Sequence, residues 1–226
     1  MRISYRLVII IAVFVTCLIT ANIIAVKVIS LGPFTVPAAI FVFPVSYIFG
    51  DVLTEVYGYR TARKAIWLAF ACNLIFVFFA WVGQVLPVAD FWEAQEAYER
   101  ILGFVPRIVG ASICGYLVGE FVNSYVLSKM KIFTKGRWLW SRTIGSTLIG
   151  EGLDTAIFIT VAFIGTASFA PVMILNHWAG KVLIEAVFTP LTYVLVNWLK
   201  RKEGINVYDS NIRFNPFVIS EKGEIS

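Results

Sequence analysis

Six long apolar runs constrain the fold of this chain more than any other feature of its sequence. About 20 helical residues, rising 1.5 Å each, cross a hydrocarbon core roughly 30 Å thick. The runs cover residues 7–30, 36–58, 64–86, 106–128, 142–164 and 171–199. The chain is 59% hydrophobic and 15% charged, whereas about a quarter of the residues of a soluble domain are charged. The sequence therefore predicts an all-α polytopic membrane protein with six transmembrane helices, in one integral membrane domain over residues 1–226.

Basic residues gather in every second connection between these runs. They are Arg2 and Arg6; Arg60, Arg63 and Lys64; Lys129, Lys131, Lys135, Arg137 and Arg142; and Lys200, Arg201 and Lys202. Because Lys and Arg accumulate in cytoplasmic loops, both termini are predicted to be cytoplasmic. This placement accounts for the net charge of +5 and predicts no nucleic-acid partner.

Two connections carry further signals. The acidic stretch 87–106 is predicted to lie outside, either as a short interfacial helix or as a solvated loop. Pro44, inside the second run, is expected to kink or break that helix.

The sequence lacks familiar catalytic and metal-site motifs. The three cysteines lie singly in apolar runs, which predicts neither a disulfide nor a zinc site, and no cofactor is expected. GASICG is not the GxSxG of serine hydrolases, and GEGLD is not the GxGD of aspartyl intramembrane proteases. An intramembrane enzyme is therefore a minor alternative.

Ionisable residues inside the apolar runs are costly and need a reason. On insertion, an acid near a helix centre costs about 2.5–3.5 kcal/mol, while a Leu or Ile contributes only about 0.3–0.6 kcal/mol in return. Such groups are functional candidates by default. Asp51, Glu120 and Glu151 each follow a glycine, and with Asn73 each lies nine positions from the nearest cytoplasmic basic residue. These four residues are therefore predicted to share one layer near the midplane.

Alternatives remain open for these charges. The acids could instead form interhelical salt bridges or hydrogen bonds that hold the bundle together, with Lys181 and Glu185 as an i,i+4 pair. Lys27, near the outer end of the first predicted helix, is expected to snorkel towards the interface.

Five further segments stand out: ANIIAVKVI, FPVSYIFGDVLTEVYGYRTARKAIW, GEFVNSYVLSKMK, TLIGEGLDTAIF and NHWAGKVLIEAVFTPLTY. These segments resemble the queuosine precursor transporter family, also called the vitamin uptake (VUT, YhhQ-type) family. The resemblance implies import of deazaguanine bases, such as 7-cyano-7-deazaguanine or 7-aminomethyl-7-deazaguanine, across the bacterial inner membrane for tRNA modification. It also implies a six-helix bundle similar to the substrate-binding subunits of energy-coupling-factor vitamin transporters.

The residue chemistry fits a purine-like substrate. A carboxylate can accept the adjacent N–H and amino donors of a guanine-type edge, and aromatic rings such as Tyr47 and Tyr116 can stack on the base. The candidate substrate-binding residues are Asp51, Glu120, Glu151, Asn73, Asp154, Glu55, Asn22, Asn123, Asn176, Trp178, Lys181 and Glu185.

Several questions stay open at the level of sequence. A binding subunit that needs a separate energising partner is the main alternative, and the small-residue stripe Ala12, Thr16 and Thr20 could pack on such a partner or on a neighbouring helix. Membrane lipids are expected partners, and a homo-oligomer is an open alternative. Which precursor is carried, and whether protons drive transport, are also open.

Overall fold

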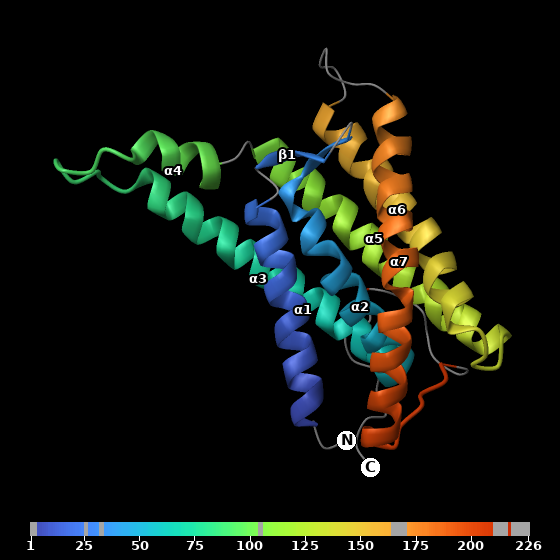
Figure 1. The fold of residues 1–226 in the computed structure, drawn as a ribbon. Coiled ribbons are helices and arrows are strands. Elements are labelled where there is room, and N and C mark those ends of the chain that lie inside the picture. The colour runs from blue at the N-terminus through green and yellow to red at the C-terminus, as the bar shows by residue number, and fades with distance from the viewer. Residues whose placement is uncertain are drawn as a thin grey trace.

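A computed structural model describes residues 4–24, 27–31, 34–103, 106–163, 171–209 and 217 of this chain. In these ranges it is a helical bundle with one short β-hairpin (Figure 1). The elements are α1 (Tyr5–Ile24), β1 (Val28–Leu31), β2 (Phe34–Pro37), the 3₁₀ turn η1 (Ala38–Phe41), α2 (Phe43–Tyr57), α3 (Tyr59–Val85), α4 (Gln95–Leu102), α5 (Pro106–Phe133), α6 (Leu139–Phe163) and α7 (Pro171–Glu203).

Four of the described helices, α1, α3, α6 and α7, are long and apolar enough to cross a membrane. This finding confirms an α-helical polytopic membrane protein. The other two predicted spans correspond to α2 and α5, which are not among these four helices. The helix α2 has only 15 residues, or about 22 Å, and α5 has 28 residues but carries Glu120, Asn123 and several glycines along its length.

The second apolar run is not one continuous helix. Strands β1 and β2 pair antiparallel, from Val28 opposite Pro37 to Leu31 opposite Phe34, and their β-branched residues favour extended backbone. Helix α2 begins only at Phe43, so the helix predicted from residue 36 is wrong over its first part. Pro44 lies in the first turn of α2, where it removes no intrahelical hydrogen bond. Of the two outcomes predicted for Pro44, a kink inside the helix is therefore wrong, whereas a break in the predicted run is observed, because α2 begins only at Phe43.

Lys27 lies beyond the end of the first helix rather than inside it. Helix α1 ends at Ile24, and the Lys27 backbone continues into the hairpin, accepting a 2.8 Å hydrogen bond from the Ala38 N–H. Its side chain is exposed. Snorkelling from within a helix therefore does not describe this lysine.

The core of the bundle surrounds α2. Helices α1, α2 and α3 bury apolar side chains against one another, including Phe14, Val52 and Ala69. Helix α7 packs on α2 and α6, and α5 packs closely along α6. Because α2 contacts α1, α3, α5 and α7, a polar side chain on α2 can meet groups from most of the bundle.

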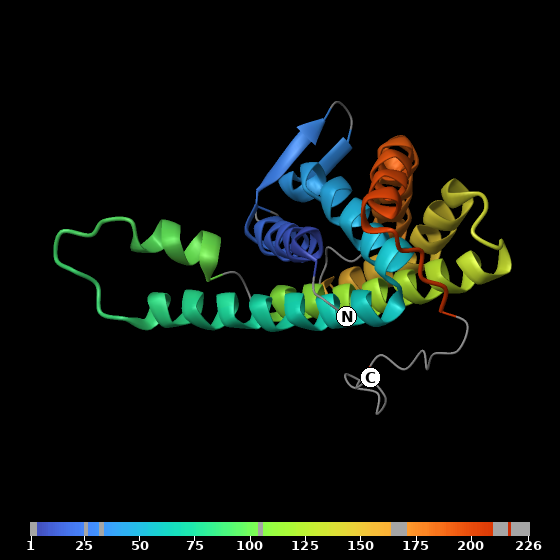
Figure 2. The same ribbon diagram turned by 90° about the horizontal axis from the view of Figure 1, so that it is seen from below.

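Helices α3 and α4 project from one side of the bundle (Figure 2). Helix α4 folds back along the end of α3, where the Tyr98 hydroxyl donates to the Ala80 carbonyl at 3.3 Å. Glu96 and Arg100 form an exposed ion pair on α4. A helix is therefore present in the acidic stretch, as one of the two sequence alternatives predicted.

Candidate functional site

Five carboxyl side chains from four helices meet inside the bundle. We call them the carboxyl cluster: Asp51 on α2, Glu120 on α5, Glu151 and Asp154 on α6, and Glu185 on α7. Asp51 and Glu185 are each 1% exposed, and Glu120 and Glu151 are each 6% exposed. Glu120 interacts electrostatically with Glu151, Asp51 and Asp154, and Glu185 with Asp51, Glu151 and Glu120. The structure thus brings Asp51, Glu120 and Glu151 together.

Glycines let these helices approach closely. A Cβ added to Gly150 would lie 2.7 Å from Asn123 Cβ and 2.8 Å from the Gly119 carbonyl oxygen, so the backbones of α5 and α6 nearly touch there. A Cβ added to Gly50 would lie 3.5 Å from Glu120 Oε2. The glycine before each acid therefore helps to place the carboxyl of one helix against the next.

Lys181 balances one side of the carboxyl cluster. Its Nζ donates to Glu151 Oε2 at 2.8 Å and also pairs with Asp154. The Tyr47 hydroxyl donates to the same Glu151 oxygen at 3.1 Å. Lys181 therefore binds across to α6, and the predicted i,i+4 pair with Glu185 is wrong, because neither Glu185 oxygen accepts a hydrogen bond from a described residue.

The other side of the carboxyl cluster has acceptors without donors. Asp51 Oδ1 accepts a 3.3 Å hydrogen bond from Asn123 Nδ2. Among the described residues, no partner is found for the acceptors Asp51 Oδ2, Glu120 Oε2, Asn123 Oδ1 and both Glu185 oxygens, nor for the Tyr116 hydroxyl, which can donate as well as accept. A buried polar group without a partner costs about 1–3 kcal/mol. This concentration of unpaired acceptors is the feature of the fold that best fits a ligand rich in N–H donors.

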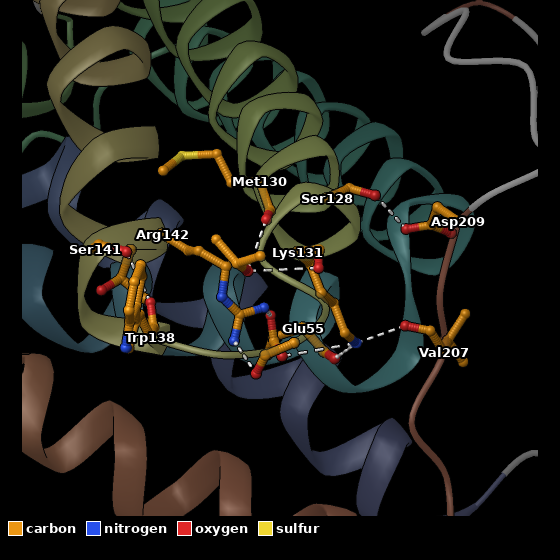
Figure 3. A network of polar contacts seen from close by, with 12 residues as sticks. Glu55, Ser128, Met130, Lys131, Trp138, Ser141, Arg142, Val207 and Asp209 are labelled. Atoms are coloured by element: carbon orange, nitrogen blue, oxygen red, sulfur yellow. Dashed lines mark hydrogen bonds and ion pairs between the residues drawn. The ribbon is translucent and has the colours of Figure 1, made fainter.

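Glu55 belongs to a separate ion-pair network (Figure 3). Its carboxylate lies 2.6 Å from Arg142 Nη1, 2.6 Å from Lys200 Nζ and 3.7 Å from Lys131 Nζ. Arg142 and Lys131 are themselves each 1% exposed. The Glu55 network ties α2 to α5, α6 and α7, so its carboxylate is already satisfied and the geometry gives no support to a substrate contact by Glu55.

Four other predicted site residues lie in different contacts. Asn22 Nδ2 donates to Asn73 Oδ1 at 2.6 Å, which joins α1 to α3, while Asn73 Nδ2 donates to the Ala69 carbonyl at 2.9 Å. Trp178 Nε1 donates to the Leu148 carbonyl at 2.9 Å and so joins α7 to α6. Asn176 is exposed. The hydrogen bonds given for Asn22, Asn73 and Trp178 thus go to groups outside the carboxyl cluster.

The segment after α7 was missed by sequence reasoning. Asp209 accepts a 3.0 Å hydrogen bond from the Tyr59 N–H at the start of α3 and another from the Ser128 hydroxyl, and Lys131 donates to the Val207 carbonyl (Figure 3). Gly58 has φ +85°, and a Cβ there would lie 2.7 Å from Val207 Cγ1. In the sequence, Gly58 at the end of a predicted helix indicates a turn, but it does not predict which distant segment packs against that turn.

The apolar helices make this chain an α-helical polytopic membrane protein, and the buried acids make the carboxyl cluster its candidate functional site, since intramembrane ionisable groups are functional candidates. The family model of the putative vitamin uptake transporters matches residues 37–195. The chain therefore belongs to that family.

Three curated relatives agree with this family. A probable queuosine precursor transporter of Bacillus subtilis (strain 168) is 34% identical over 148 residues, which span 65% of each chain. The queuosine precursor transporter of Escherichia coli (strain K12) is 28% identical over 72% of this chain and 73% of the relative. A probable queuosine precursor transporter of Haemophilus influenzae is 27% identical over 71% of this chain and 68% of the relative. The match thus spans under two thirds of the Bacillus protein, and no solved structure matches the chain.

Proposed function

We propose that this protein imports queuosine precursors, deazaguanine bases such as 7-cyano-7-deazaguanine or 7-aminomethyl-7-deazaguanine, across the bacterial inner membrane. The family and the names of the three relatives support a transporter of this class. The observation that carries the proposal is the pair of buried acceptors without donors on Glu120 and Asn123. A guanine-type edge would supply the missing N–H donors.

Glu120 is the residue we place first against the base. Glu151 is already held by Lys181 and Tyr47, whereas Glu120 Oε2 is buried without a partner. A carboxylate that accepts two adjacent N–H groups forms a charge-assisted bidentate contact, which is stronger than a neutral pair. Asn123 Oδ1, one helical turn along α5, offers a further acceptor to the same ligand.

The proposed topology has six spans and both termini in the cytoplasm. The start of α1 and the end of α7 lie together, because Arg6 Nη1 is 3.1 Å from Glu203 Oε1 and Ser4 Oγ donates to the same oxygen at 2.7 Å. The basic residues of the Glu55 network come from segments that the positive-inside rule assigns to the cytoplasm. This arrangement would resemble the substrate-binding subunits of energy-coupling-factor transporters.

Uptake by a Glu120→Gln variant tests the proposed function. The amide keeps the shape of the side chain but replaces one acceptor with a donor that faces the donors of the base. We expect uptake at low base concentration to fall about 30- to 1,000-fold, equivalent to about 2–4 kcal/mol, with normal membrane expression. Glu99→Gln, on the exposed helix α4, is the matched control. Parent-like uptake by both Glu120→Gln and Glu151→Gln would place the base elsewhere.

A binding subunit that works with an energising partner is the second candidate. The small-residue stripe on α1 supports it, because Ala12 and Thr16 are exposed and small residues allow close helix contacts. Uptake in a host without any energising module separates the two candidates, since only a self-sufficient transporter works there.

A further inference from the structure

The carboxyl groups of Asp51 and Glu185 face each other without a donor between them. They lie within hydrogen-bonding reach, and each residue is 1% exposed. An ionised carboxylate only accepts hydrogen bonds. Among the described residues, Asp51 Oδ2 and both Glu185 oxygens find no donor. Two adjacent buried carboxylates can satisfy each other only if one of them carries a proton and donates it to the other.

The charges around this pair favour the same conclusion. The charged residues around the Asp51–Glu185 pair are Glu55 on α2, Glu120 on α5, and Glu151 and Arg142 on α6. Lys181 on α7 is bound to Glu151 and Asp154, and Arg142 is bound to Glu55. Both cations are therefore committed to other carboxylates, and like charges so close together are not ionised at once in a dry interior.

We propose that the Asp51–Glu185 pair holds one proton that crosses the membrane with each molecule of base, which makes this protein a proton symporter. The inference rests on the proposed function, because it names the ion that accompanies the proposed substrate. It assigns Glu120 and Asn123 to the base and the Asp51–Glu185 pair to the proton.

The proton balance of one cycle is simple. A proton from the outer water binds a Glu185 oxygen, and the resulting O–H donates to Asp51 Oδ2. After the site opens inward and the base leaves, the proton passes to the inner water. Water in the vacated site then solvates the two ionised carboxylates until a new proton binds. 7-Cyano-7-deazaguanine carries no charge at neutral pH, so its symport with one proton moves one positive charge inward per cycle, and both the pH gradient and a negative interior drive accumulation.

A proton fits this pair better than Na⁺. In transporters, Na⁺ is commonly bound by backbone carbonyls that unwound helix segments expose. Helices α2 and α7 are both continuous at Asp51 and Glu185, so the carbonyls of these two residues take part in helical hydrogen bonds. Pro190 in α7 removes the helical donor of the Ala186 carbonyl, but a single freed carbonyl provides fewer ligands than a Na⁺ site needs.

Coupling can be measured on the purified full chain in proteoliposomes, with radiolabelled 7-cyano-7-deazaguanine as the probe. The membrane potential is held at zero with K⁺ and valinomycin. We expect an inward proton gradient to drive at least tenfold accumulation, and addition of base without a gradient to alkalinise the outer medium. Exchange of labelled for unlabelled base at equilibrium needs binding but no net proton movement, so it serves as the reference for each variant.

The Glu185→Gln variant should uncouple the two movements. We expect the ratio of gradient-driven accumulation to equilibrium exchange to fall at least tenfold, while Glu99→Gln keeps the ratio of the parent. A parent-like ratio in Glu185→Gln overturns the proposal. If this variant does not reach the membrane, alkalinisation of the medium by the parent decides the question.

The failures of the two proposals are distinguishable. A parent that exchanges no base contradicts the proposed function itself. A parent that exchanges base but accumulates it without regard to the proton gradient, or in response to a Na⁺ gradient, leaves the proposed function standing and overturns proton symport.

Discussion

Asp51 and Glu55 lie one turn apart on α2, yet their surroundings give them different chemistry. The Glu55 carboxylate is bound by Arg142 and Lys200 at 2.6 Å each, with Lys131 at 3.7 Å. Asp51 receives one amide hydrogen bond, from Asn123. A carboxylate saturated by cations stabilises a bundle, whereas an acceptor without a donor is available to a ligand or a proton. These surroundings make Glu55 a structural residue and Asp51 a functional candidate.

Stability measurements should separate these two kinds of acid. Glu55→Gln leaves buried cations without their carboxylate, and breaking a buried ion pair by removing one partner costs about 3–5 kcal/mol. We therefore expect a clear loss of thermal stability in detergent. Glu120→Gln should unfold at the parent temperature or above it, because it removes a buried charge without a cation partner.

Glu96→Gln provides the control for this comparison. Its exposed pair with Arg100 on α4 is worth about 0.3–0.5 kcal/mol, so the variant should be close to the parent. Equal stability of Glu55→Gln and Glu96→Gln would show that the Glu55 network contributes little.

The packing of α5 on α6 depends on glycines at the contact. Gly150→Ala would place a Cβ 2.7 Å from Asn123 Cβ and 2.8 Å from the Gly119 carbonyl oxygen. Both neighbours belong to α5, so its backbone would have to move away from α6. We expect a loss of about 1–3 kcal/mol, the usual cost of overpacking, measured by thermal unfolding, and a displaced Asn123. Gly180→Ala meets nothing within 4 Å and should be neutral or slightly stabilising, because alanine favours a helix. Parent-like stability of Gly150→Ala would contradict this account of the contact.

The segment 204–209 acts as a cap for α3. Asp209 accepts the Tyr59 N–H at 3.0 Å and binds Ser128, so it satisfies an amide that the helix start would leave unpaired. Asp209→Ala should cost about 0.5–2 kcal/mol, the range for loss of an N-cap, seen as a lower unfolding temperature and faster proteolysis after residue 203. Asp209→Asn keeps one acceptor oxygen and should lose less. An Asp209→Ala variant as resistant as the parent would show that this contact does not hold the segment.

At the scale of the whole molecule, the distribution of charge predicts orientation. A single cysteine at position 94, beside the acidic helix α4, should react with an impermeant maleimide in intact cells. A cysteine at position 135, in the basic connection between α5 and α6, should react only after the inner face is opened. Both require replacement of the native Cys17, Cys72 and Cys114. The reverse labelling pattern would invert the topology.

The membrane character and most helix positions followed from the sequence. A backbone in hydrocarbon must satisfy its own hydrogen bonds, so a long apolar run has few choices besides a helix. The predicted runs 64–86, 106–128, 142–164 and 171–199 accordingly correspond to α3, α5, α6 and α7. Each helix extends a few residues beyond its run at one end. Hydropathy did not predict the strands β1 and β2, which satisfy their hydrogen bonds with each other, because apolar content does not distinguish a strand from a helix.

Only the tertiary structure decided what each buried acid meets. Spacing placed Asp51, Glu120 and Glu151 at one depth, but depth along a helix says nothing of its rotation or of its neighbours. That Lys181 reaches Glu151 and Asp154 on α6 rather than Glu185 on its own helix depends on how α7 packs against α6. Long-range contacts of this kind come from the joint packing of all the helices, so no local pattern in the sequence encodes them.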